Sequence, residues 1–249
     1  MNEIDIYAGF AERYDLMDGS FDDNDPVMVE FFRQIFVKNH VTSTLDCACG
    51  TGQHLLLFHK LGLMVRGSDA SQAMLAQARR NLSNYGVEVN LRQADYRELP
   101  EYFNQDFDAV VCLGSIGYMP DETQFIRAFR SMYSVIKEGG IMIMTSIVTD
   151  KQWREQPRFK LSVDVPEITR LFVMDYLYTT VEYNIVDIYH NQEVGGLKVW
   201  SAELTVLLQG DQERLLKASG FQEVNFYGAF DFSSYDKKNS DLLITVAYK

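Results

Sequence analysis

The sequence predicts an α/β fold: a doubly wound, mostly parallel seven-stranded sheet that carries an antiparallel β insertion after its fifth strand. Three observations predict it. In the first half, short apolar runs alternate with helix-length segments, which is typical of a parallel sheet with helices on both faces. After about residue 160, long β-branched and aromatic segments follow one another without helices. A helix and two more apolar runs then close the chain.

The predicted strands are apolar runs bounded by turn or cap residues. In the first half they span residues 43–48, 63–69, 87–93, 107–114 and 141–148. The last two predicted strands of the main sheet span residues 221–228 and 241–248. Inside the insertion, strands are expected at residues 170–178, 181–190 and 197–208, the last two separated by the turn signal "NQEVGG".

Capping residues place the helices between these strands. Asp25 followed by Pro26 is typical of an N-cap and a first helical position. The other expected N-caps are Ser71, Asp121 (with Gln124 as a capping box) and Asp211. The expected ends are Gly62, Gly86 and the pair Gly139-Gly140. The helices therefore span about residues 26–38, 53–62, 72–82, 122–137 and 212–220.

Composition narrows the class of protein. The 249 residues carry a formal net charge of −12, so a nucleic-acid partner is not expected. The first residues have no basic, apolar leader, and no run of 18 apolar residues occurs, so we expect neither a signal peptide nor a membrane partner. Three cysteines suit a reducing compartment, and we expect a cytoplasmic protein. No histidine or cysteine spacing indicates a metal site.

The candidate site lies at the carboxyl ends of the predicted parallel strands, where such sheets bind ligands. The first strand runs into Ala48 and then Gly50-Thr51-Gly52, where bare backbone and a helix N-terminus favour an anionic group. Both S-adenosylmethionine and a dinucleotide could bind such a loop. A dinucleotide fingerprint has a third glycine where this chain has Leu55, which argues against NAD and a dehydrogenase.

The later strand ends supply further candidates. Asp69 ends the second strand, followed by Ala70, and an acidic residue there could hold two ribose hydroxyls. Asp95 follows the third strand and could accept from an adenine amino group. Met74 and Leu113 could sandwich the adenine, although core packing is the commoner role of such residues.

Taken together, "LDCACGTG", "VRGSDASQAML", "QADYREL", "FDAVVCLGSIGYM" and "GGIMIM" resemble a class I S-adenosylmethionine-dependent methyltransferase with a Rossmann-like fold. Two branches are most similar: glycine and glycine/sarcosine N-methyltransferases, and N,N-dimethyltransferases of nucleotide-linked amino sugars. The resemblance implies S-adenosyl-L-methionine as cofactor. It also implies a cofactor site lined by Tyr14, Ala48, Gly50, Asp69, Asp95, Tyr96 and Leu113.

The resemblance divides the chain into three parts. Residues 1–40 are expected to form an N-terminal helical lid segment over the cofactor. Residues 41–150 and 209–249 are expected to form the cofactor-binding domain. The insertion, residues 160–208, is expected to carry acceptor contacts or the contact of a homo-oligomer.

The methyl acceptor is expected to be a small molecule, with an amine favoured because both similar branches methylate amines. The arginine with which glycine N-methyltransferases hold a carboxylate has no counterpart in "SIVTD", which argues against glycine itself. Expected acceptor-pocket walls are Tyr7, Tyr118 and Trp153, and Tyr14 is the candidate for a catalytic role. An O-methyltransferase and a non-catalytic S-adenosylmethionine-binding protein remain alternatives.

Overall fold

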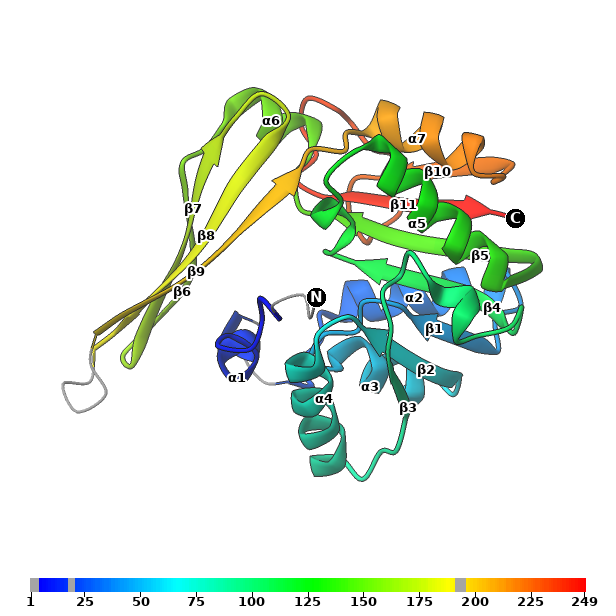
Figure 1. Ribbon diagram of the computed structural model, residues 1–249, viewed down its shortest axis with the longest axis horizontal. Helices are drawn as coiled ribbons and strands as arrows, with labels where there is room; N and C mark the ends of the chain where they lie inside the picture. The colour runs from blue at the N-terminus through cyan, green and yellow to red at the C-terminus, as the bar shows by residue number, and fades with distance from the viewer. Residues whose placement is uncertain (1–4, 18–20, 191–195) are drawn as a thin grey trace.

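The computed structural model describes residues 5–17, 21–190 and 196–249. Its main sheet has seven strands in the order β10-β11-β5-β4-β1-β2-β3. Only β11 runs opposite to the other six strands, so the predicted mostly parallel, doubly wound sheet is confirmed (Figure 1). The strands are β1 (Ser43–Asp46), β2 (Met64–Asp69), β3 (Asn90–Gln93), β4 (Phe107–Leu113), β5 (Ile136–Ser146), β10 (Glu223–Tyr227) and β11 (Leu243–Tyr248).

Helices cover both faces of this sheet because its central strands are apolar on both sides. Along β4, Ala109 and Val111 pack toward α2 (Pro26–Lys38) and α3 (Gln53–Lys60). Val110 and Cys112 pack toward the opposite face, against α5 (Glu122–Val135) and α7 (Gln209–Ala218). The helix α4 (Gln72–Asn84) packs beside α3 through a smaller apolar cluster.

The predicted N-cap residue is confirmed at three helices and is wrong at one. Asp25, Ser71 and Asp121 each accept a hydrogen bond from the first turn of α2, α4 and α5. The last helix begins earlier than predicted: Leu208 is the N-cap of α7 and Asp211 lies in its first turn. No local polar cap marks that start, which explains the error.

The boundary between α5 and β5 also differs from the prediction. The helix ends at Val135 and β5 begins at Ile136, so Gly139 and Gly140 lie within the strand. A Cβ on Gly140 would lie 2.7 Å from the carbonyl oxygen of Asp108 on β4. This glycine therefore permits close approach of two strands at a register shift, rather than ending a helix.

The insertion is a four-stranded antiparallel sheet in the order β6-β7-β8-β9, which projects from the main body (Figure 1). Its strands are β6 (Phe159–Val165), which was not predicted separately, β7 (Ile168–Tyr176), β8 (Thr180–Tyr189) and β9 (Gly196–Thr205). The short helix α6 (Asp150–Glu155) leads into it, and the short N-terminal helix α1 (Ala11–Tyr14) lies against its inner face (Figure 1). No helix of the described ranges is long and apolar enough to cross a membrane.

Candidate functional site

A cavity of about 1620 Å³ opens at the carboxyl ends of β1 to β5. Ordinary small-ligand pockets measure roughly 300–1,000 Å³, so this cavity has room for two ligands side by side. Most of the predicted site residues line it: Tyr7, Tyr14, Ala48, Gly50, Asp69, Ala70, Met74, Asp95, Tyr96, Leu113 and Tyr118. Within the described ranges, no group of three His, Cys, Asp or Glu side chains is placed to hold a metal ion.

Two predicted site residues lie outside this lining. Gly52 has a φ of 93° at the N-cap of α3, and a Cβ there would lie 3.3 Å from the Cβ of Ala78 on α4. It is therefore required for the turn and for helix packing. Trp153 packs against Tyr176 in a cluster at the base of the insertion, with ring centroids 6.0 Å apart. Another tryptophan, Trp200, lies near the cavity instead, because β9 directs it toward the N-terminal segment.

The glycine loop and the end of β2 are joined through Asp69. One carboxylate oxygen of Asp69 accepts from the backbone N–H of Gly50 at 2.9 Å, and the other accepts from the N–H of Ser71 at 2.8 Å. Burial raises the pKa of Asp69 to about 6, and the nearby Asp5 carboxylate adds to the rise while the two N–H bonds oppose it. Burial also raises the pKa of Asp46, at the end of β1, to about 7. Buried carboxylates thus surround the glycine loop.

The end of β3 presents a charge pair rather than an isolated carboxylate. The Nε of Arg97 donates to the two carboxylate oxygens of Asp95 at 2.9 and 3.0 Å. The Tyr96 hydroxyl donates to the carbonyl oxygen of Ser115 at 3.1 Å, and burial raises its pKa well above the usual value. Arg97 was not predicted as a site residue. Its position two residues after Asp95 is the only feature of the sequence that could have indicated this charge pair.

The N-terminal segment, here residues 5–17, connects the insertion to the glycine loop and to α4. At one end, Asp5 accepts from Ser71 Oγ at 2.9 Å and from Ala73 N at 3.1 Å, at the start of α4. In its middle, the fully buried Phe10 stacks on Trp200 with centroids 4.9 Å apart. At the other end, Asp15 accepts from the Thr51 hydroxyl and from Asn81.

A buried ion cluster fixes this segment to the insertion. Arg170 on β7 donates from Nε and Nη2 to Asp187 on β8, at 2.5 and 2.9 Å, and both side chains are fully buried. Arg170 also donates to the backbone carbonyl oxygens of Arg13 at 2.8 Å and of Tyr14 at 3.2 Å. The guanidinium of Arg13 donates to the same carboxylate. The position of Tyr14 in the cavity therefore depends on residues of the insertion.

Aromatic side chains form the wall between the N-terminal segment and the insertion. The ring of Tyr7 lies 6.2 Å from that of Tyr118 and 5.1 Å from that of Trp200. Burial raises the pKa of Tyr7 well above the usual value and that of Tyr118 to about 12. Both are therefore neutral phenols near pH 7, able to orient a ligand through hydrogen bonds.

Further residues that sequence reasoning did not select as site residues also line the cavity. They come from the segment before α2, the start of α3, the end of β5, the edge strand β9 and the loop before β11. They include Asp23, Asn24, Asp25, His54, Thr145, Ser201, Ala202 and Phe230. Burial lowers the pKa of His54 to about 4, so its imidazole is neutral near pH 7.

Comparison with known proteins shows that this chain is similar to methyltransferases. Residues 44–140 match the family described as a methyltransferase domain. The chain is 27% identical to a glycine/sarcosine N-methyltransferase of Aphanothece halophytica, over 88% of this chain and 81% of that protein. Its fold matches an S-adenosylmethionine-dependent methyltransferase of Clostridium acetobutylicum (TM-score 0.79, 21% identity, covering 97% of this chain and 98% of the other). It also matches a sugar N-methyltransferase of Streptoalloteichus (TM-score 0.71, 23% identity, covering 95% and 92%).

These matches cover the glycine loop, the strand ends and the insertion that form the cavity described above. The expected cofactor, S-adenosyl-L-methionine, agrees with these matches: the Clostridium protein is an S-adenosylmethionine-dependent methyltransferase, and a glycopeptide N-methyltransferase of similar fold (TM-score 0.57) is complexed with S-adenosylmethionine. The resemblance to a class I S-adenosylmethionine-dependent methyltransferase is confirmed: residues 44–140 match a methyltransferase domain, and proteins similar over most of the chain carry methyltransferase names.

Proposed function

We propose that this chain is a cytoplasmic enzyme that transfers the methyl group of S-adenosylmethionine to the nitrogen of a small-molecule amine. The observation that carries the proposal is the large cavity, whose lining includes many residues beyond those predicted to hold the cofactor. The N-methyltransferase names of similar proteins support an amine acceptor. The insertion contributes Ser201 and Ala202 to the lining, which supports a role for it in acceptor binding.

The cofactor roles follow from position along the sheet. We assign Asp69 to the ribose hydroxyls, since its carboxylate lies at the end of β2 beside the glycine loop. Asp95 would accept from the adenine amino group, with Met74 and Leu113 on the two faces of the ring. The backbone around Gly50 and the N-terminus of α3 suit the cofactor carboxylate.

Methyl transfer proceeds by in-line displacement, so alignment of the two reactants is the main requirement. Good alignment can lower a barrier by roughly 7–11 kcal/mol. General base catalysis contributes typically 10²–10⁴-fold, about 3–5 kcal/mol. We assign the alignment to Tyr14, held in place through its carbonyl by Arg170, and to Tyr118, a neutral phenol that can orient the amine.

The expected result is turnover with amines. The purified protein and S-adenosylmethionine are incubated with matched amines, phenols and alcohols, and mass spectrometry follows S-adenosylhomocysteine and the methylated product. We expect N-methylated product and stoichiometric S-adenosylhomocysteine. Methylation of hydroxyl groups alone would favour an O-methyltransferase, and cofactor binding without turnover on any acceptor would favour a binding protein.

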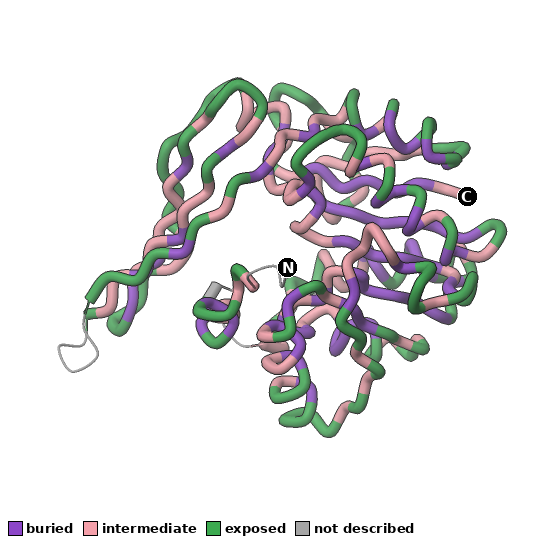
Figure 2. Tube along the Cα trace, in the orientation of Figure 1, coloured by how far each residue is buried: buried purple, intermediate pink, exposed green. Residues whose placement is uncertain are grey.

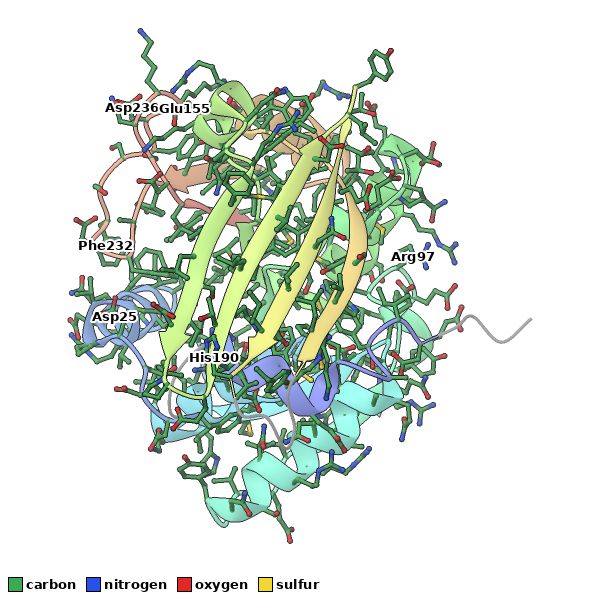
Figure 3. The ribbon with its side chains drawn as sticks, turned by 90° about the vertical axis from the view of Figure 1, so that its left-hand side faces the viewer. Asp25, Arg97, Glu155, His190, Phe232 and Asp236 are labelled. Atoms are coloured by element: carbon green, nitrogen blue, oxygen red, sulfur yellow. The ribbon has the colours of Figure 1, made fainter. Side chains whose placement is uncertain are left out.

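The outer face of the insertion supports a homo-oligomer. In the view of Figure 3 this sheet faces the viewer with no helix in front of it, and Figure 2 shows exposed and half-buried residues along its strands. Leu161, Leu171, Val186 and Val199 form one apolar row across all four strands. From strand geometry the face measures roughly 570 Å². Two copies packed face to face would cover roughly 1,100 Å², enough for a specific interface.

We therefore expect a dimer of twice 28.6 kDa that the Val199→Lys variant dissociates. Val199 is 52% exposed on this face, and a buried lysine there would remain unpaired. The matched control is Val37→Lys, a 65% exposed valine on α2 that is outside the insertion. Sedimentation equilibrium measures the mass of each variant. A monomeric wild-type protein, or an unchanged dimer in Val199→Lys, would contradict this interface.

A further inference from the structure

The residues that line the cavity fall into two groups. The residues proposed to hold the cofactor come from the ends of β1, β2, β3 and β4. The second group, here called the acceptor arm, comes from the segment before α2, the start of α3, the end of β5 and the loop before β11. It includes Asp23, Asn24, Asp25, His54, Thr145 and Phe230. In Figure 3, Asp25 and Arg97 lie on opposite sides of the molecule, consistent with these two groups.

The acceptor arm carries negative charge, and the described residues that line it include no lysine or arginine that could bind an acid group of a ligand. In the described ranges, the only lysine or arginine that lines the cavity is Arg97, which is paired with Asp95 after β3. Arg13 and Arg170 are paired with Asp187, and Lys60 with Asp22. The undescribed ranges, residues 1–4, 18–20 and 191–195, contain no lysine or arginine.

The remaining groups of the arm suit an N–H donor. The side-chain oxygen of Asn24 is buried and has no hydrogen-bond partner among the described residues. This oxygen has almost no accessible surface, so the carboxylates of Asp23 and Asp25 are the acceptors of this segment that a ligand can reach. The neutral His54 imidazole adds no positive charge. The carboxylates of Asp23 and Asp25 favour a cationic ligand, and Phe230 offers an aromatic ring.

We propose that the acceptor is an amine that carries no carboxylate or phosphate group and binds in the acceptor arm beside the Asp23 carboxylate. This inference rests on the proposed N-methyltransferase function. The amine enters as an ammonium ion and loses one proton to solvent water. Its lone pair then forms the N–C bond as the S–C bond of the cofactor breaks. The positive charge passes from sulfur to the methylated nitrogen, and S-adenosylhomocysteine leaves as a neutral thioether.

The test uses pairs of acceptors that differ only by an acid group: tyramine and tyrosine, histamine and histidine, ethanolamine and serine, and glucosamine and glucosamine 6-phosphate. For each pair, kcat/KM is measured by S-adenosylhomocysteine release, and affinity is measured calorimetrically on protein loaded with S-adenosylhomocysteine. We expect the acid-free member of at least one pair to be preferred about 100-fold in both measurements. An acid-bearing member that matches or exceeds its partner would overturn the inference, as would failure of all the acid-free members to bind.

Methylation of an acid-bearing amine would overturn this inference and leave the proposed N-methyltransferase function intact. Turnover of hydroxyl acceptors alone would overturn the proposed function itself. The charge of the arm is tested with Asp23→Lys, an exposed position. This variant should lower the preference for the acid-free member at least tenfold, whereas Glu88→Lys, the same charge change at an exposed position outside the cavity lining, should not. An unchanged preference in Asp23→Lys would remove the electrostatic basis of the proposal.

Discussion

Replacing Asp69 with alanine is expected to weaken S-adenosylmethionine binding about 100-fold. If the carboxylate accepts both ribose hydroxyls, the variant loses two charge-assisted hydrogen bonds, together worth roughly 3 kcal/mol. It also loses the bonds from the N–H groups of Gly50 and Ser71, which position the glycine loop and the start of α4. Titration calorimetry measures the affinity, and circular dichroism checks the fold.

Ser71→Ala is the matched control because it removes the hydroxyl that caps α4 and donates to Asp5, and it leaves Asp69 in place. It should cost the protein about 1 kcal/mol of stability and change cofactor affinity little. A loss below threefold in folded Asp69→Ala would mean that Asp69 only supports the local backbone.

If Asp69 binds the ribose hydroxyls, the affinity for the cofactor should depend on pH. Because burial raises the pKa of Asp69 to about 6, the carboxylate becomes protonated as the pH falls through that value. Protonation removes a hydrogen-bond acceptor, so affinity should be full above about pH 7 and decline below pH 6. In Asp69→Ala this decline should be absent.

The sequence was sufficient for the parts of the site that are local in the chain. A loop that follows a strand and starts a helix must lie at the carboxyl edge of a parallel sheet. Gly50, Asp69 and Asp95 could therefore be placed at the cavity without knowledge of strand order. The cap at Ser71 was predictable for the same reason, since it depends on a bond only three residues away.

The parts that could not be predicted depend on contacts between distant segments. Trp153 was selected as a pocket wall, but Trp200 packs beside Tyr7, and that contact depends on how β9 pairs within the insertion. Asn24 and Phe230 lie at one cavity although about 200 residues separate them, and no local pattern joins them. Gly52 was predicted to contact the ligand because of its position in the glycine loop. In the structure it packs against Ala78 of α4 instead.

The ion cluster of Arg13, Arg170 and Asp187 was also invisible in the sequence. Lone charged residues in a strand with alternating polarity are normally solvent-exposed. Arg170 and Asp187 are nevertheless fully buried opposite each other on β7 and β8. The cluster is closed by Arg13 from a segment more than 150 residues away, so only the folded structure shows it.

Removing the shared carboxylate of this cluster is expected to have the largest effect on stability. Asp187→Ala leaves Arg170 and Arg13 without their anion in a buried site, and breaking a buried pair in this way typically costs about 3–5 kcal/mol. Urea unfolding measures the free energy of unfolding. The matched control is Asp175→Ala, an exposed carboxylate on β7, which should change stability by less than about 0.5 kcal/mol.

The cluster should also control catalysis through the N-terminal segment. Arg170 donates to the carbonyl oxygens of Arg13 and Tyr14, and Asp187 holds the Arg170 guanidinium in the position that makes these bonds. In Asp187→Ala we therefore expect faster amide hydrogen exchange in residues 5–17 and a larger loss of kcat than of cofactor affinity, since the residues proposed to hold the cofactor at the ends of β1 to β4 are untouched. Arg170→Lys serves as a second variant, because it keeps the charge and loses the planar fork that reaches carboxylate and carbonyls together. It should show the same faster exchange with a smaller loss of stability. Unchanged exchange and unchanged kcat in a folded Asp187→Ala protein would limit the cluster to a role in stability and would separate the insertion from the chemistry at the methyl group.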